Sequence, residues 1–132
     1  MRLFSTLALF LAVLAFHPAS ADEVRRETVR FDRGTSGTTI NSSVRGYDTV
    51  QYVLGVRSGQ KLDVQLDTNN ASNYFNITAP GASEALYNSS IDGNGASVTI
   101  PSSGNYLIDV YLMRNAARRG ETATYSLTLY VE

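Results

Sequence analysis

The sequence predicts an all-β fold, an antiparallel β-sandwich or barrel of about eight short strands in one domain, and three observations support it. Apolar and polar residues alternate with a period of two in several segments, as in strands with one buried face. Glycine, asparagine, serine and proline fill the gaps, and helical periodicity is nearly absent. Because the segments recur every ~8–12 residues without crossover helices, antiparallel pairing is expected.

Four segments carry the clearest alternation. Their apolar residues are Val50, Tyr52, Leu54 and Val56; Leu62, Val64 and Leu66; Tyr106, Ile108, Val110 and Leu112; and Ala123, Tyr125, Leu127, Leu129 and Val131. Ser58 and Gly59 predict a turn between the first two. Shorter candidate strands cover residues 28–33, 38–44, 74–78, 85–88 and 96–100.

The first 21 residues have the three parts of a secretory signal peptide. Arg2 supplies the positive start, an apolar run of about 14 residues follows, and Ala19-Ser20-Ala21 forms a small-x-small cleavage site. The run is shorter than the ~20 residues that span a bilayer, so cleavage is favoured over a retained anchor. The mature domain is then residues 22–132, exported to a periplasm or outer surface without an integral membrane segment. It has no cysteine, so its hydrophobic core must stabilise it without disulfides.

The charge of the mature chain argues against nucleic-acid binding. Without Arg2, 10 basic and 12 acidic residues remain, a formal charge of −2, whereas nucleic-acid binding draws on many phosphate contacts. Lys61 is the only lysine, so almost all basic charge is arginine. The guanidinium is a flat, five-donor fork suited to carboxylates, although genomic base composition explains the bias equally well.

The residues that are missing exclude most catalysis. His17, the only histidine, lies in the signal, so the mature chain lacks the usual general base and has neither nitrogen nor sulfur ligands for zinc or copper. The remaining designs are a carboxylate pair or a cation held by oxygen atoms. Residues 92–95 (DGNG) begin like a calcium loop, but the later acidic residues of such a loop are absent, so a glycine turn is favoured. We therefore expect no enzyme, no metal and no cofactor.

Three arginines lie within six residues between the last two clear strands: Arg114, Arg118 and Arg119. The segment is longer than the usual two to five residues of a hairpin loop. If residues 115–118 form one helical turn, Arg114 and Arg118 lie four positions apart and project from the same side. Their mutual repulsion requires an anion. A partner protein can supply it, or Glu121 and a nearby aspartate can, which would leave a solvated loop without a function.

A second region departs from plain strand chemistry. In Arg45-Gly46-Tyr47-Asp48, the glycine interrupts the chain just before a strand and leaves an aromatic hydroxyl beside two charged groups. A tyrosine at a strand end more often lies at the rim of a core, so Tyr47 alone is a weak indicator of a binding site.

Several segments of the chain together have the pattern of a known family. The most specific is residues 106–127 (YLIDVYLMRNAARRGETATYSL), and shorter matches in the same order are Gly46-Tyr47-Asp48, Asn73-Tyr74-Phe75-Asn76, Pro80-Gly81 and Glu84-Ala85-Leu86. In these segments the chain resembles the bacterial periplasmic inhibitors of goose-type (g-type) lysozyme. The resemblance implies an antiparallel β-sandwich and a protein partner, g-type lysozyme, whose substrate cleft is blocked. It also implies that Arg114 and Arg118, with Tyr47, make the contacts. Arg119 matches too, and which of Arg118 and Arg119 faces the partner is left open, as is self-association.

Two other functions compete with inhibition. Eight tyrosines and many amide and hydroxyl side chains are also compatible with a carbohydrate- or peptidoglycan-binding module without inhibitory activity. Nucleic-acid binding through Arg118-Arg119-Gly120 is disfavoured, because one small cluster on an exported acidic protein makes few phosphate contacts.

Overall fold

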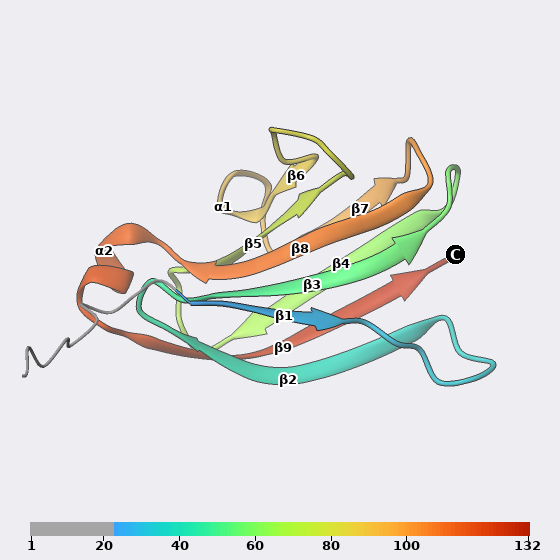
Figure 1. The fold of residues 1–132 in the computed structure, drawn as a ribbon. Helices are drawn as coiled ribbons and strands as arrows, with labels where there is room; N and C mark the ends of the chain where they lie inside the picture. Colours follow the sequence, from blue (N-terminus) through green and yellow to red (C-terminus); the bar gives the residue numbers. More distant parts are fainter. Residues whose placement is uncertain (1–22) are drawn as a thin grey trace, which may run out of the picture.

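The computed structural model describes residues 23–132, and the predicted signal peptide, residues 1–21, lies outside the described residues. The described chain folds into two layers of strands (Figure 1). The strands are β1 (Val24–Thr28), β2 (Gly37–Arg45), β3 (Thr49–Val56), β4 (Lys61–Thr68), β5 (Asn73–Thr78), β6 (Tyr87–Asn88), β7 (Gly95–Thr99), β8 (Gly104–Leu112) and β9 (Thr122–Val131). The helices are α1 (Ser89–Asp92) and α2 (Arg114–Arg118). No helix within residues 23–132 has the length and apolar character needed to cross a membrane.

The strands form a β-sandwich, as predicted. One sheet has five strands in the order β1-β3-β8-β5-β6, and the other has four in the order β2-β9-β4-β7. The pairs are antiparallel except for β1 and β3, which run parallel at one edge. The two faces that meet between the sheets form the hydrophobic core.

The alternation read from the sequence corresponds to burial. Every alternating apolar residue named for the four clearest segments is buried, while the residues between them are exposed or only partly covered. Burying one Leu, Ile or Val side chain contributes about 1.5–3 kcal/mol to the free energy of folding. The buried residues of these strands therefore stabilise the domain without disulfides. The hydroxyl groups of Tyr52 and Tyr125, one from each sheet, lie 2.7 Å apart inside the core and satisfy each other.

The first strand was predicted at the wrong place. The sequence predicted a strand over residues 28–33, but β1 covers Val24–Thr28 and ends where the predicted strand begins. β1 is an exposed edge strand whose residues show no alternation of burial, so period two does not reveal it. Val29 and Phe31, which suggested the later strand, pack against the core from the segment that follows β1.

The connections between the clearest predicted strands cross between the two sheets. β3 and β4 lie in different sheets, and so do β8 and β9, which flank the arginine segment. The β2–β3, β4–β5 and β8–β9 connections all turn at the same end of the sandwich, since Arg45 pairs with Thr122 and Asn73 pairs with Leu112. We call this the α2 end; it comprises residues 45–49, 69–72 and 113–121.

Replacing Leu127 with alanine is expected to lower the free energy of unfolding by about 2–5 kcal/mol, because the fully buried side chain leaves a cavity between the sheets. Urea unfolding measures the change. Thr124→Ala, on an exposed position of the same strand, is the matched control and should change stability by less than about 0.5 kcal/mol. Equal losses in both variants would contradict the assignment of Leu127 to the core.

Candidate functional site

α2 has one buried side and one exposed side. Ala116 and Ala117 are buried against the sandwich, and the amide of Ala117 donates to the carbonyl of Met113 at 2.9 Å. Arg114 and Arg118 are exposed at its two ends. The helical turn considered for residues 115–118 is present, and it also includes Arg114. The two arginines therefore lie one turn apart, on a helix held in place by its buried alanines.

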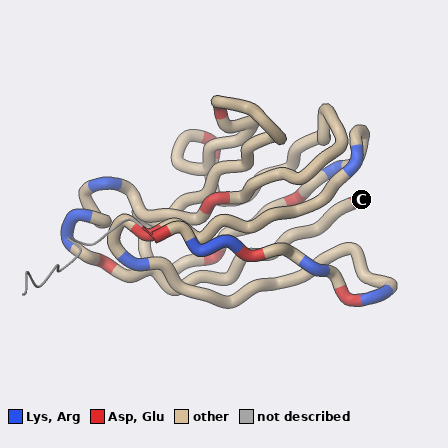
Figure 2. Tube along the Cα trace, in the orientation of Figure 1, with Lys and Arg blue, Asp and Glu red and all other residues tan. Residues whose placement is uncertain are grey.

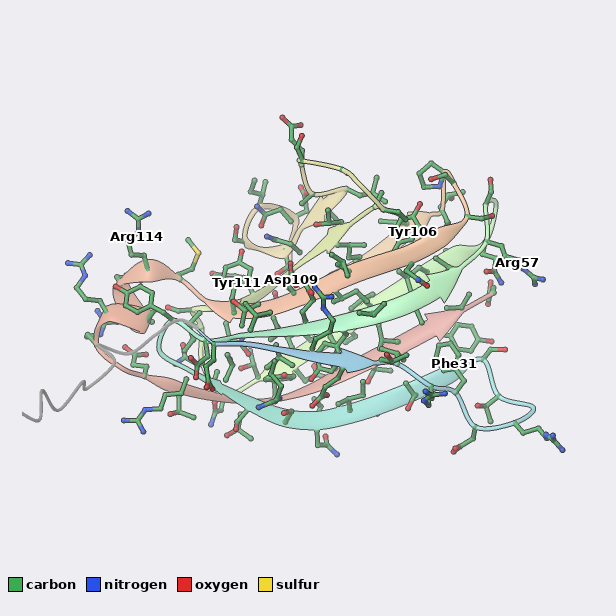
Figure 3. All side chains as sticks on the ribbon, viewed as in Figure 1. Phe31, Arg57, Tyr106, Asp109, Tyr111 and Arg114 are labelled. Atoms are coloured by element: carbon green, nitrogen blue, oxygen red, sulfur yellow. The ribbon has the colours of Figure 1, made fainter. Side chains whose placement is uncertain are left out.

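The three arginines of the segment differ in their partners. Arg119 is bound to Glu121, with its Nη2 and Nε 2.6 Å and 2.7 Å from Oε2. Among residues 23–132, neither Arg114 nor Arg118 has an ion pair. Arg114 points away from the sandwich (Figure 3). Neutralisation by an internal acid thus applies to Arg119, and two guanidinium groups remain available to a partner.

Tyr47 lies beside α2 in the turn between β2 and β3. Gly46 adopts a left-handed conformation (φ 58°) that suits glycine, and its amide donates to the carbonyl of Glu121 at 2.9 Å. The Tyr47 side chain is 43% exposed. Tyr47 and Arg118 line one hollow of about 410 Å³. The other residues around this hollow are Glu23, Arg45, Gly46, Asp48, Ala117 and Gly120. The fold thus brings together two predicted site residues that are far apart in the sequence.

Glu121 connects the three loops of the α2 end. Its Oε1 accepts a hydrogen bond from Nδ2 of Asn70 at 2.9 Å, and its Oε2 holds Arg119. Its carbonyl accepts from Gly46, and its amide donates to the carbonyl of Ala116 at 3.2 Å. The hydrogen bond from Asn70, followed by the contact with Arg119, lowers the pKa of the Glu121 carboxyl. The carboxylate of Glu121 thus binds the β4–β5 connection and Arg119, and its backbone carbonyl binds the β2–β3 turn.

The charges at the α2 end are mixed, with the basic groups of α2 outermost. The basic residues are Arg45, Arg114, Arg118 and Arg119, and the acidic ones are Asp48 and Glu121, with Glu23 next to Asp48. Figure 2 shows basic positions along α2 at the tip of the sandwich. Oδ1 of Asp48 accepts a hydrogen bond from the amide of Glu23 at 3.2 Å, so this acid is engaged with the start of the described chain. The outermost part of the α2 end thus presents positive charge.

Sequence reasoning missed the residues that organise the site. Asn70 was assigned only to a gap between strands, yet its Oδ1 accepts from the amide of Ser72 at 2.9 Å and its Nδ2 holds Glu121. The bond to Ser72 is an Asx turn, in which an asparagine side chain binds the amide two residues later, and an asparagine in a loop is the sequence signal for it. Nothing local signals the second bond, because Glu121 follows on a distant loop. Met113, 40% exposed before α2, was also overlooked.

The DGNG segment is a turn, as favoured from the sequence. Gly93 ends α1 with φ 98°, and Asn94 donates from Nδ2 to the carbonyl of Asn73 at 3.3 Å. Within residues 23–132, no three acidic or other ligating side chains gather around a point where a metal ion would bind.

Comparison with known proteins identifies the family. A periplasmic inhibitor of g-type lysozyme from Aeromonas hydrophila, known from its crystal structure, is 35% identical to this chain in sequence. The two structures match with a TM-score of 0.79 over 85% of this chain and 100% of that one. This chain belongs to the periplasmic inhibitors of g-type lysozyme. The inhibitor from Salmonella Typhimurium is 30% identical, with a TM-score of 0.69 over 82% and 98% of the two chains. An inhibitor of g-type lysozyme from Escherichia coli strain K12 is 28% identical over 108 residues, 79% of each chain.

These findings confirm the resemblance read from the sequence and the sandwich fold. The relatives are inhibitor proteins and not enzymes. No family model matches the chain. A pre-peptidase C-terminal domain of a collagenase from Bacillus anthracis, 19% identical with a TM-score of 0.54, shares the fold alone.

Glu121→Gln is expected to lower stability at neutral pH, and this loss should shrink in acid. Because folding lowers the pKa of Glu121 below its ordinary value of 4.5, the carboxylate stabilises the fold above that value, and the contribution disappears as the pH falls through the lowered pKa. Urea unfolding of parent and variant at about pH 7 and about pH 3 measures the difference. Glu84→Gln is the control, since Glu84 is exposed in the β5–β6 connection. A difference between parent and Glu121→Gln that is the same at both pH values would contradict this role.

Proposed function

We propose that this protein is a periplasmic inhibitor of g-type lysozyme that inserts α2 into the acidic substrate cleft of the enzyme, with Arg114, Arg118 and Tyr47 as contacts. The observation that carries the proposal is the pair of exposed guanidinium groups one helical turn apart, neither of them ion-paired within residues 23–132. Membership of the inhibitor family supports the choice of partner.

The chemistry of the enzyme suits this contact. A glycosidase cleaves its substrate with acidic residues in a groove. Each guanidinium can meet a carboxylate through two parallel hydrogen bonds, and the inhibitor needs no catalytic group of its own. Because the opposite side of α2 is buried, the helix is already ordered before binding, so little conformational entropy is lost.

Arg119 takes a different part in this proposal. The sequence grouped it with the contact residues, but in the free protein its guanidinium is bound to Glu121. Of the two adjacent arginines, we therefore assign the partner-facing role to Arg118, which lines the same hollow as Tyr47.

The proposed location follows from the leader. We propose that residues 1–21 are a signal peptide and that residues 22–132 form the inhibitor domain in the periplasm. The relatives from Aeromonas hydrophila and Salmonella Typhimurium are periplasmic by description, which supports this location. There the inhibitor stands between the cell wall and an invading hydrolase.

Arg114→Ala and Arg118→Ala are each expected to weaken inhibition of a g-type lysozyme at least tenfold, because truncating one partner of a desolvated charge pair costs roughly 2–5 kcal/mol. Lysis rates of a cell-wall substrate at increasing inhibitor concentration measure the effect, and the melting temperature should not change. Arg33→Ala is the matched control, since Arg33 is exposed in the β1–β2 connection at the opposite end. Normal inhibition by the Arg114→Ala/Arg118→Ala double variant would contradict the proposed contacts.

A second candidate function, glycan binding, is favoured by the outer face of the five-stranded sheet. Arg26, Gln51, Asp109 and Asn76 stand opposite one another across β1, β3, β8 and β5. Nε of Arg26 donates to Oε1 of Gln51 at 2.8 Å, and the hydroxyl of Tyr111 donates to Oδ1 of Asn76 at 3.3 Å. Asp109 and Tyr111 are labelled along β8 in Figure 3. A row of planar polar groups beside an aromatic ring is suited to hydrogen bonding and stacking with a sugar.

Glycan binding is tested with peptidoglycan fragments in the absence of lysozyme. If the sheet face binds them, calorimetric titration gives saturable binding that Tyr111→Ala removes and Arg118→Ala leaves intact. No saturable binding by the parent protein would exclude this second function and leave the inhibitor proposal unaffected.

A further inference from the structure

We infer that Glu121 is a positioning residue of the inhibitory site, which holds Arg118 and Tyr47 in their relative places, and that Arg119 serves as its counter-ion and not as a contact to the enzyme. This inference rests on the proposed function and deepens it. It concerns an ion pair next to the proposed contact residues.

The contacts of Glu121 reach both sides of the Tyr47–Arg118 hollow. Its carbonyl binds the amide of Gly46, the residue before Tyr47, and its amide binds the carbonyl of Ala116, two residues before Arg118. Its carboxylate is in turn fixed by Asn70 and Arg119. A shift of Glu121 therefore moves the β2–β3 turn relative to α2.

Hydrogen bonds on both sides of Asn70 hold the β4–β5 connection in place. Asn69 and Thr124 exchange two hydrogen bonds, of 3.1 Å from the Asn69 amide to the Thr124 carbonyl and 2.9 Å from the Thr124 amide to Asn69 Oδ1. The amide of Met113 donates to the carbonyl of Ser72 at 2.9 Å. The connection is thus bound to Met113 before α2 and to Thr124 near the start of β9. Asn70 lies between these two points of attachment and donates its side-chain amide to Glu121.

Loss of the carboxylate would also change the charges next to Arg118. Arg119 follows Arg118 directly, and its positive charge is offset at 2.6 Å by Glu121. Without that anion, the Arg119 guanidinium is free to leave its place and to repel its neighbour or compete with it for the same partner carboxylate. The ion pair with Glu121 fixes the direction of the exposed Arg119 side chain and offsets its charge.

The sign of the effect separates positioning from simple charge. Removing an acid from a surface that approaches an acidic cleft should speed association and tighten binding if long-range electrostatics alone acted. Positioning predicts the opposite, because the same substitution disorders the contact groups. Glu121→Gln, which keeps the size of the side chain and removes its charge, therefore gives opposite results under the two explanations.

The experiment is a double-mutant cycle of Glu121→Gln with Arg118→Ala, read as the inhibition constant against a g-type lysozyme. Glu121→Gln alone is expected to weaken inhibition about fivefold, and in the Arg118→Ala background by less than about twofold, since Glu121 acts through the placement of Arg118 and the effects of coupled residues are not additive. Glu84→Gln removes an equal charge from the exposed β5–β6 connection and is expected to leave inhibition unchanged or slightly tighter.

A second variant covers a failure of Glu121→Gln to fold. Asn70→Ser leaves the net charge unchanged and keeps an oxygen for the Ser72 amide, but the shorter side chain does not reach Glu121. It is expected to weaken inhibition in the same coupled way. If Arg118→Ala weakens inhibition while Glu121→Gln and Asn70→Ser act normally, tighten it or act additively with Arg118→Ala, the positioning role is wrong and the proposed contacts stand. If Arg114→Ala/Arg118→Ala inhibits normally, the proposed function itself fails.

Discussion

Two sheets pack face to face, and each must bury the apolar side of its strands against the other. A chain that alternates between the sheets can turn only at the two ends of the sandwich, so three connections are forced together at the α2 end. There the short helix covers the end of the core with Ala116 and Ala117 and leaves its arginines outside. The exposure of Arg114 and Arg118 is thus a consequence of core packing.

One carboxylate governs the electrostatics of this end. Three arginines close together would repel one another, and Glu121 relieves part of that repulsion by binding Arg119. One internal acid for three cations leaves the loop ordered but still positively charged. Under the proposed function, this positive charge is what meets the carboxylates of the enzyme.

Inhibition makes chemical demands that this composition satisfies. The domain after the predicted signal lacks histidine and cysteine, and the described residues gather no metal ligands, but a protein that obstructs a cleft needs only shape, rigidity and complementary charge. The hydrophobic core supplies the rigidity without disulfides. The same sandwich occurs in a collagenase domain at 19% identity, so the fold by itself does not specify a function.

The sequence alone determined the strands with one buried face and the family, because alternation and the segment around α2 are properties of neighbouring residues. It did not determine β1, whose exposed edge has no alternation, nor that β8 and β9 belong to different sheets. The meeting of Tyr47 with Arg118, and of Asn70 with Glu121, was decided by the tertiary structure. Those contacts join residues on separate connections, and only the crossing of the chain between two packed sheets brings them within reach.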